Sequence, residues 1–258
     1  MLAKSSVEIL GAPPTNSEMT LLLIDFDPIL YRAASTAETE LEFNPECTVV
    51  IGDFKRGKQI VKQLMREMMT RFDTTHVLCF TTSPINFRKT VFPDYKGNRV
   101  KRKPSGYLKL KNWAKDTWPT YEREGLEADD LLGVACTSGK HPDFILCSPD
   151  KDLQQFPVKI WNGKELFQQT KEAAVFKRWE QALTGDQTDG YPGARGIGPK
   201  RAHQLLSQVK DGDYWPVVRD AFLDAGHTEE DAITSVRLAT ILTADMIDSA
   251  GKPILFTP

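Results

Sequence analysis

Histidine and cysteine are scarce in this sequence, and neither residue occurs at a spacing typical of a zinc site. The 258 residues include four histidines and four cysteines, and no two cysteines form a CxxC pair. Structural zinc sites need such closely spaced nitrogen and sulfur ligands, so the sequence does not indicate one. The widely separated cysteines, mostly in apolar runs, instead indicate free thiols in a reducing compartment.

Long apolar runs and an excess of charge of one sign are also missing. The longest apolar runs, such as Leu21–Ile24 and Phe144–Cys147, are far too short to span a bilayer, and residues 1–19 do not resemble a secretory signal. The 33 basic and 35 acidic residues give a formal charge of −2. This balance excludes a polycationic coat protein, but nucleic-acid binding needs only a local basic surface. We therefore expect a cytoplasmic globular protein without a membrane partner.

Short apolar runs of strand length alternate with helical patterns through the first two thirds of the chain. We expect strands at 20–25, 76–80, 144–148 and 158–161, and helices at 55–72, 105–117 and 127–138. This alternation predicts an α/β fold with a mostly parallel sheet between helices. Further helices are expected at 172–184, 198–208, 214–225 and 229–245. The chain thus divides into an extension (1–19), an α/β domain (20–170) and a helical part (171–258).

Positive charge is concentrated in residues 86–115, where ten basic residues accompany a single acid. Such a block is often only a solvated face, and that interpretation stays open. Here aromatic residues, including Tyr95 and Tyr107, are interleaved with the cations. Cations and aromatics together hold phosphates and stack bases, so the block is a candidate nucleic-acid interface.

Carboxylates occur where two expected strands end, where a helix starts and in a turn-rich loop. They are Asp25, Glu127, Asp129, Asp130, Asp150, Asp152, Asp186 and Asp189. Each alone has a structural explanation, either the helix dipole or turn formation. Together at one edge of a parallel sheet they would repel strongly without cations. Oxygen-only ligands favour Mg²⁺ or Mn²⁺, and a pair of such ions suits phosphoryl chemistry.

A glycine-rich loop at residues 191–202 is the sharpest local signal. Gly196 and Gly198 permit a close approach of backbone N–H groups to a phosphate, and Pro199 suits a first helical turn. Lys200 and Arg201 add positive charge. A P-loop does not fit, because Pro199 stands where its lysine belongs. A helix–two-turn–helix motif over 185–207 that contacts duplex backbone fits better, and an ordinary glycine turn is the alternative.

These segments, in this order, closely resemble the 5′→3′ exonuclease and flap endonuclease superfamily, and most of all the replication exonucleases of short-tailed bacteriophages. The matching stretches are Leu22–Asp27, Asp94–Arg99, Leu126–Asp130, Ser148–Asp152, Gly185–Gly193 and Gly196–Lys200. The resemblance implies a PIN-like α/β fold with a basic helical arch at 86–115 above the acidic floor. It also implies a metal-dependent 5′→3′ exodeoxyribonuclease or flap endonuclease that uses two divalent ions.

The resemblance also implies roles for individual residues. The eight carboxylates would hold the metals, with Asp130 in an outer position, and Asp25 and Asp129 would act directly in catalysis. Lys96 and Arg99 would contact the scissile phosphate, and Tyr95 would stack on a terminal base. The remaining residues expected to bind DNA are Arg88, Lys89, Lys101, Arg102, Lys103, Tyr107, Gly196, Gly198, Lys200 and Arg201.

The resemblance also implies partners for this chain, and the sequence departs from the family pattern at one place. It implies DNA with 5′ ends as substrate, RNA/DNA hybrids in primer removal, phage replication proteins in the host cytoplasm, and K⁺ on the glycine hairpin. The family places another metal-site Asp after the second strand, where this chain has Thr81 and Thr82. One metal is then expected to be held more weakly or through water, with Asp27 as a substitute acid. Two alternatives stay open, a PIN-like ribonuclease and a non-catalytic protein that binds DNA ends.

Overall fold

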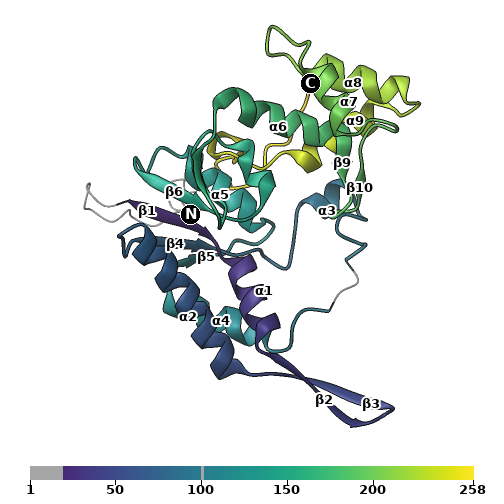
Figure 1. Cartoon of the computed structure of the whole chain (residues 1–258). Helices are drawn as coiled ribbons and strands as arrows, with labels where there is room; N and C mark the ends of the chain where they lie inside the picture. Colours follow the sequence, from purple (N-terminus) through teal and green to yellow (C-terminus); the bar gives the residue numbers. More distant parts are fainter. Residues whose placement is uncertain (1–19, 100–101) are drawn as a thin grey trace.

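A six-stranded sheet forms the centre of the computed structural model, which describes residues 20–99 and 102–258 (Figure 1). The strand order is β5-β4-β1-β6-β7-β8, and all strands run parallel except β8, which pairs antiparallel with β7. The strands are β1 (Leu21–Asp25), β4 (Val77–Phe80), β5 (Thr120–Tyr121), β6 (Phe144–Cys147), β7 (Lys159–Trp161) and β8 (Leu166–Gln168). The expected mostly parallel sheet is therefore present.

Both faces of this sheet are buried, which explains why its strands are continuous apolar runs. Alternate residues of β1 point to opposite faces, so Leu23 packs beneath α5 (Ala128–Thr137) and Leu22 beneath the helices on the other side. Those helices are α1 (Phe26–Thr36), α2 (Phe54–Arg71) and α4 (Tyr107–Thr117). The two layers hold β1 at the centre of the sheet, where all five of its residues are buried.

The C-terminal part forms a helical unit with its own apolar cluster. Its helices are α6 (Lys171–Thr184), α7 (Pro199–Leu206), α8 (Trp215–Asp224) and α9 (Glu229–Ala239), and Trp179 and Phe222 lie in their shared core. The tail then returns to the sheet, because Ile241, Leu242 and Ile247 pack in the cluster beneath α5. The helix expected at 229–245 ends at Ala239, since Thr240 is extended and the chain turns back there.

The basic segment 86–115 differs from the expected helical arch. It contains the four-residue helix α3 (Arg88–Val91) and most of α4, but the described residues between them form turns and irregular backbone. Two prolines and two glycines, Pro93, Gly97, Pro104 and Gly106, interrupt this stretch and disfavour a helix. Residue Lys101, like residues 1–19, lies outside the described part of the chain.

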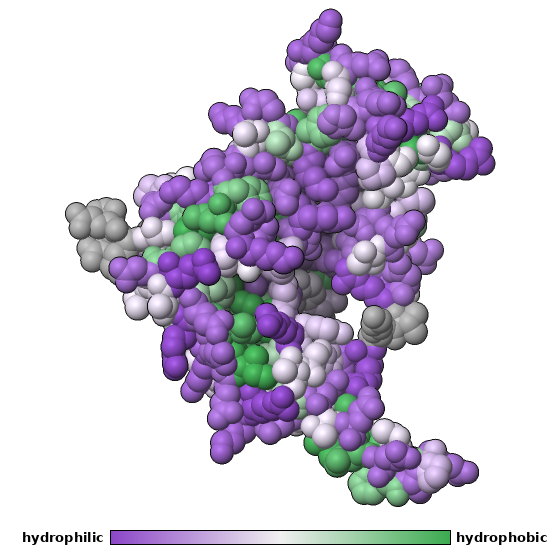
Figure 2. Space-filling view, in the orientation of Figure 1, coloured by the Kyte–Doolittle hydropathy of each residue, from purple (hydrophilic) through white to green (hydrophobic). Residues whose placement is uncertain are grey.

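A two-stranded ribbon that is not among the expected elements follows α1. Its strands, β2 (Glu38–Asn44) and β3 (Cys47–Gly52), pair with each other and project from the body (Figure 1). Leu41, Phe43, Val49 and Ile51 remain exposed on it, and Figure 2 shows apolar side chains there. Within residues 20–99 and 102–258, no helix is both long and apolar enough to cross a membrane.

Candidate metal centre and nucleic-acid interface

The carboxyl ends of β1, β4 and β6 meet at one edge of the sheet, and they bring the first group of acids together. Asp25 ends β1 and is 5% exposed, and its Oδ2 accepts a hydrogen bond from Ser148 Oγ at 2.8 Å. Asp150 follows β6 and caps the short 3-10 helix η2 (Lys151–Gln155). In an open parallel sheet this edge is where ligands bind.

The N-terminus of α5 supplies further acids at the same edge. Glu127 is its N-cap and Asp129 lies in its first turn. The hydroxyl of Thr82, at the end of β4, accepts a hydrogen bond from the Ala128 N–H at 3.1 Å. The positive end of the α5 dipole therefore faces the acids, although it balances only a fraction of their charge.

Burial and mutual repulsion raise the pKa values of Asp25 and Asp129. Burial, together with the charges of Asp27 and Asp150, raises the pKa of Asp25 to about 7 against the opposing hydrogen bond from Ser148. Burial likewise raises the pKa of Asp129 well above its ordinary value, and Asp25, Asp150 and Glu127 add to this effect. Closely spaced carboxylates with raised pKa values are suited to binding a hard cation.

A second group of acids continues from Asp150 toward the C-terminal part. Burial raises the pKa of Asp152, and the charges of Asp150 and Asp186 raise it further. Gln181 Nε2 donates to Asp152 Oδ2 at 2.8 Å, whereas the buried Oδ1 has no hydrogen-bond partner among the described residues. A buried carboxylate oxygen without a partner is costly and would be satisfied by a cation. The oxygen-only donor set thus fits divalent metal ions such as Mg²⁺ or Mn²⁺.

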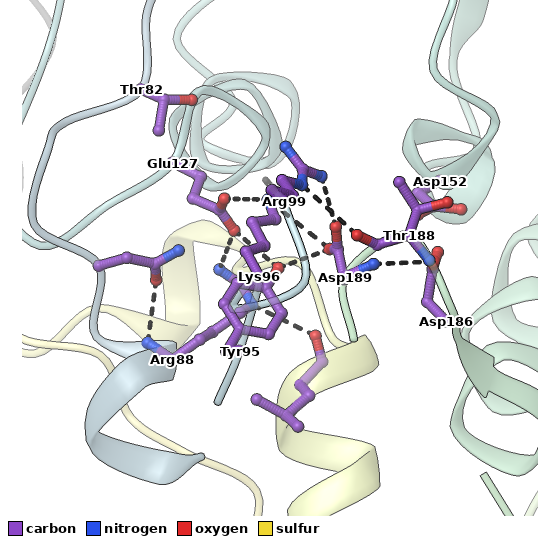
Figure 3. A network of polar contacts seen from close by, with 12 residues as sticks. Thr82, Arg88, Tyr95, Lys96, Arg99, Glu127, Asp152, Asp186, Thr188 and Asp189 are labelled. Carbon is purple, nitrogen blue, oxygen red and sulfur yellow. Dashed lines mark hydrogen bonds and ion pairs between the residues drawn. The ribbon is translucent and has the colours of Figure 1, made fainter. Parts of the chain in front are cut away.

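Basic side chains form ion pairs with two other expected metal ligands, Glu127 and Asp189. Lys96 forms an ion pair with Glu127 and lies 3.6 Å from Asp189, whose Oδ1 accepts from Arg99 Nη2 at 2.6 Å (Figure 3). Burial alone would favour the neutral form of Glu127, but Arg88 and Lys96 hold its pKa down at about 2. Among the described residues, no three His, Cys, Asp or Glu side chains are arranged as a ready metal site.

Asp130, which was expected in an outer position around the metal, forms its hydrogen bonds within the protein. It is fully buried, and its two carboxylate oxygens accept from Arg88 at 2.7 and 2.8 Å. The Glu127 and Leu242 N–H groups donate to it as well. With both oxygens engaged, Asp130 fixes the start of α5, and its expected outer position around the metal stays a prediction.

Three residues expected to contact DNA are buried instead. Arg88 is 2% exposed, and besides Asp130 and Glu127 it donates to backbone carbonyls of the α9 segment. Tyr95 is also 2% exposed, and its hydroxyl lies 2.7 Å from Asp189 and 3.0 Å from Glu127. The buried Tyr107 donates to Asp27 at 3.1 Å. Counting charge along the sequence cannot reveal such pairing, and the assignment of these three residues to DNA binding stays a prediction.

Three other basic residues of the segment that were expected to bind DNA are accessible, whereas Lys111 is buried and pairs with Glu122. Lys89, Arg102 and Lys103 are exposed, although Arg102 pairs with Glu38 of β2 at 2.6 Å. Lys96 adopts a left-handed backbone conformation with φ of 57°, and its N–H donates to the Asp189 carbonyl at 2.7 Å. Such strain in a non-glycine residue is typical of functional sites, and here it places the ammonium group among the acids.

The glycine loop lies between α6 and α7, which pack against each other. Gly196 has φ of 77°, which requires glycine, whereas Gly198 has φ of −91° and directly precedes Pro199 of α7. Ile197 between them is buried and anchors the loop. Lys200 and Arg201 are exposed in the first turn of α7, so charge and free N–H groups occur together.

Three polar residues near the acids were not among the residues singled out for the site. Ser148 and Gln181 hold Asp25 and Asp152, as described above. Asp27, which the sequence suggested only as a substitute acid, accepts from the Thr82 N–H at 2.8 Å and from the Tyr107 hydroxyl. Asp27 thus occupies the neighbourhood of the missing family aspartate. Its position two residues beyond a strand end was the available signal.

The ionisation of Asp25 predicts how stability depends on pH without metal. Its pKa is about 7 in the folded protein and 3.8 in the reference state, so folding favours the protonated form. The associated stability is complete below about pH 4 and is lost as pH rises through 7. We expect the melting temperature in EDTA to fall between pH 5 and pH 8, and Asp25→Asn to reduce this fall. An identical pH dependence in wild type and variant would contradict the assignment.

The sequence of this chain is similar to a family of known nucleases and to two phage proteins. A family profile described as 5′-3′ exonuclease, N-terminal resolvase-like domain, matches residues 20–180. An exodeoxyribonuclease of Enterobacteria phage T3 is 27% identical, over 92% of this chain and 93% of that protein. An exonuclease of Escherichia phage T7 is also 27% identical, over 91% and 92%.

A solved structure of the bacteriophage T5 flap endonuclease, a pseudo-enzyme-product complex with DNA and metal ions, shares the fold. Its TM-score is 0.63 at 17% identity, over 85% of this chain and 88% of that one. The α/β fold and the family resemblance inferred from the sequence are therefore confirmed.

Proposed function

Because this chain belongs to the family of 5′-3′ exonucleases with a resolvase-like N-terminal domain, we propose that it hydrolyses DNA phosphodiesters at or near 5′ ends. It is a 5′-3′ nuclease, a hydrolase that acts on DNA, and its relatives are the T3 exodeoxyribonuclease and the T7 exonuclease. The observation that carries the proposal is the set of repelling carboxylates Asp25, Asp129 and Asp150 at the carboxyl edge of the sheet.

Divalent metal ions are the cofactor that this acidic edge fits. The T5 flap endonuclease was solved with metal ions and DNA, which supports metal dependence and DNA binding for this chain. We assign the role of metal ligands to Asp25, Asp129, Asp150, Asp152 and Asp186, and to Glu127 and Asp189 once DNA draws their basic partners away. Two Mg²⁺ or Mn²⁺ ions, when bound, would polarise the phosphodiester and make water a better nucleophile.

The chain's own residues orient the substrate. Lys96 and Arg99 reach the acids from the basic segment, and a DNA phosphate competes with Glu127 and Asp189 for their charge. Their donors would then stabilise the charge that develops on the scissile phosphate. Lys89 and Lys103 provide exposed charge nearby, and the glycine loop with Lys200 and Arg201 would contact duplex backbone without reading sequence. Action on RNA/DNA hybrids, phage replication partners and K⁺ on the loop stay predictions.

End-labelled DNA tests this function directly. Duplex with a recessed 5′ end, a 5′ flap and a single strand are each incubated with Mg²⁺, with Mn²⁺ and with EDTA. We expect metal-dependent products from the 5′ end and none in EDTA. Thr81 and Thr82 in place of the family aspartate favour a second candidate, a DNA-end-binding protein without activity. Binding without cleavage under all metal conditions would support that candidate, and preferential cleavage of RNA would indicate a ribonuclease.

Lys96→Ala is expected to reduce turnover by about 10²–10³-fold, the effect of removing one donor to developing charge. DNA affinity should change much less, since many other phosphate contacts remain. Lys89→Ala, which removes an exposed lysine from the same segment, is the matched control and should affect affinity only. Single-turnover rates and equilibrium binding separate the two effects. If Lys96→Ala lost affinity but cleaved normally when saturated, Lys96 would be a general phosphate contact.

The glycine loop is expected to contribute affinity for duplex. Lys200→Ala should lower the slope of log affinity against log salt by about 0.9, because one phosphate is no longer neutralised. Gly198→Val should weaken duplex binding with little loss of thermal stability, since a Cβ there meets no described atom within 4 Å. Lys164→Ala, in the exposed β7–β8 turn, is the control. An unchanged salt slope together with lost stability would assign the loop a structural role only.

A further inference from the structure

Two buried side-chain oxygens near Asp186 have no hydrogen-bond partner among the described residues. One is Oδ1 of Asp152, which lies with Asp186 at one side of the network in Figure 3. The other is the hydroxyl of Tyr191, a residue that is only 3% exposed. Burying a polar group without a partner is costly, and most such groups in native proteins are satisfied. Two of them beside the same acid indicate that a polar ligand belongs there in the functional protein.

Backbone pairing places Tyr191 beside the second group of acids. The short strands β9 (Gly185–Asp186) and β10 (Tyr191–Pro192) pair antiparallel, and Tyr191 stands directly opposite Asp186. Side chains of directly opposite residues share one face of such a pair. Burial raises the pKa of Tyr191 well above its ordinary value, and the charges of Asp186 and Asp152 raise it further. Both carboxylates therefore act on the phenol group of Tyr191.

The ring of Tyr191 is fixed by packing, which also fixes the position of its hydroxyl oxygen. It belongs to the apolar cluster of the helical unit, together with Trp179. The ring of Tyr95 stacks on it, with ring centres 6.3 Å apart and ring planes at 30°. The Tyr95 hydroxyl contacts Glu127 and Asp189, so it is already engaged. Of these two stacked tyrosines, only Tyr191 has a hydroxyl that is available to a ligand.

A hydrated divalent cation satisfies both unpartnered oxygens. The ion itself suits Asp152 Oδ1, because carboxylate oxygens are the protein ligands that Mg²⁺ prefers. Mg²⁺ gives up its waters reluctantly and keeps several of them in protein sites. The O–H groups of those waters need acceptors, and a tyrosine oxygen accepts hydrogen bonds while its own O–H stays free to donate. A single water that bridges the two oxygens without an ion is the alternative ligand.

We propose that Tyr191 is a positioning residue of the metal centre and binds the water shell of the divalent ion at Asp152. The inference rests on the proposed function, since it takes Asp152 as a metal ligand. It adds a residue that acts on the ion only through water and therefore favours ions that hold their waters firmly. Mg²⁺ is such an ion, whereas Ca²⁺ takes more of its ligands directly from protein oxygens.

Tyr191→Phe tests the proposal, because it removes the hydroxyl and keeps the ring in its cluster. Tyr214→Phe is the matched control, a half-buried tyrosine of the same helical unit that stacks on Trp179. The melting temperature is measured in EDTA, and Mg²⁺ and Ca²⁺ are then titrated calorimetrically without DNA. In EDTA we expect Tyr191→Phe to be at least as stable as wild type, since it loses no hydrogen bond to another residue.

We expect Tyr191→Phe to weaken the binding of one Mg²⁺ ion about tenfold, the lower range for residues that support the ligands of a metal. Its Ca²⁺ affinity should change much less, and Tyr214→Phe should bind both ions like wild type. In an Asp152→Asn background, Tyr191→Phe should cause little further loss of Mg²⁺ affinity. Equal Mg²⁺ affinity of wild type and Tyr191→Phe, or full additivity with Asp152→Asn, would overturn the assignment.

Wild-type measurements separate this inference from the proposed function. Mg²⁺-dependent cleavage of end-labelled DNA is followed in parallel. Normal cleavage by wild type, with Mg²⁺ binding unchanged in Tyr191→Phe, overturns only the role of Tyr191. A wild type that neither binds Mg²⁺ nor cleaves DNA counts against the proposed function and this inference together. A lower melting temperature of Tyr191→Phe in EDTA, with unaltered Mg²⁺ affinity, would assign the hydroxyl to a bridging water and overturn the proposal.

Discussion

Asp25→Asn is expected to lower metal-dependent DNA cleavage by about a thousandfold while DNA affinity is retained. Metal ions in such a site contribute several kcal/mol of transition-state stabilisation, and several kcal/mol correspond to this factor in rate. Asp25 is the buried acid on which Asp27 and Asp150 act electrostatically, so its charge is central to the group. Removing one negative charge also lowers repulsion toward the DNA backbone, so affinity should not fall.

The measurement compares single-turnover cleavage across a range of metal concentrations with DNA binding in EDTA. Asp143→Asn is the matched control, because Asp143 precedes β6 at the opposite edge of the sheet and is exposed. That variant should cleave like wild type. Undiminished turnover of Asp25→Asn would remove the acidic edge from the mechanism, whereas a lost activity restored by higher metal concentration would show weaker metal binding only.

Arg88→Met is expected to destabilise the fold by about 3–5 kcal/mol, the usual cost of leaving a buried charge without its partner. The Arg88 guanidinium connects α3, the start of α5 and the end of α9 through Asp130, Glu127 and the carbonyls of Leu238 and Thr240. Its loss would leave Asp130 fully buried and without its counter-charge. Denaturant unfolding of the two proteins in EDTA measures the difference in free energy.

A double variant separates this structural role from DNA binding. Arg88→Met combined with Asp130→Asn removes both charges, and it should recover a large part of the lost stability. Lys89→Met, at the exposed neighbouring position, should leave stability close to wild type. If Arg88→Met instead folded normally and lost only DNA affinity, the result would support the assignment of Arg88 to the DNA interface.

Local sequence patterns predicted the elements that build the acidic edge. Leu21–Asp25 forms a strand because five consecutive buried positions need an apolar run, and the carboxylate at its end follows from that placement. The helix beginning after Glu127 was recognisable from its acids and apolar spacing. The ribbon at Glu38–Gly52 was missed because its apolar residues remain exposed and do not extend a buried run.

Pairing between distant residues decided what the site residues do. Arg88 and Asp130 are 42 positions apart, and Tyr95 and Asp189 are 94 apart, yet each pair is in direct contact. A charge count over residues 86–115 treats Arg88 and Lys89 alike, although one is buried and the other is exposed. The contact between Asp27 and Thr82 likewise cannot be predicted from the sequence, because only the pairing of strands β1 and β4 brings the two residues together.

By itself the sequence determined the alternation of strands and helices, the edge at which acids gather and the family to which these motifs belong. Those properties depend on short-range periodicity and on the order of motifs, which are fixed by covalent sequence. Only the tertiary structure decided which acids are free for a cation, which cations are already paired, and that Asp152 and Tyr191 each bury an oxygen without a hydrogen-bond partner among the described residues. The physical reason is that burial and ion pairing depend on distances between side chains from separate elements, which exist only after the chain has packed.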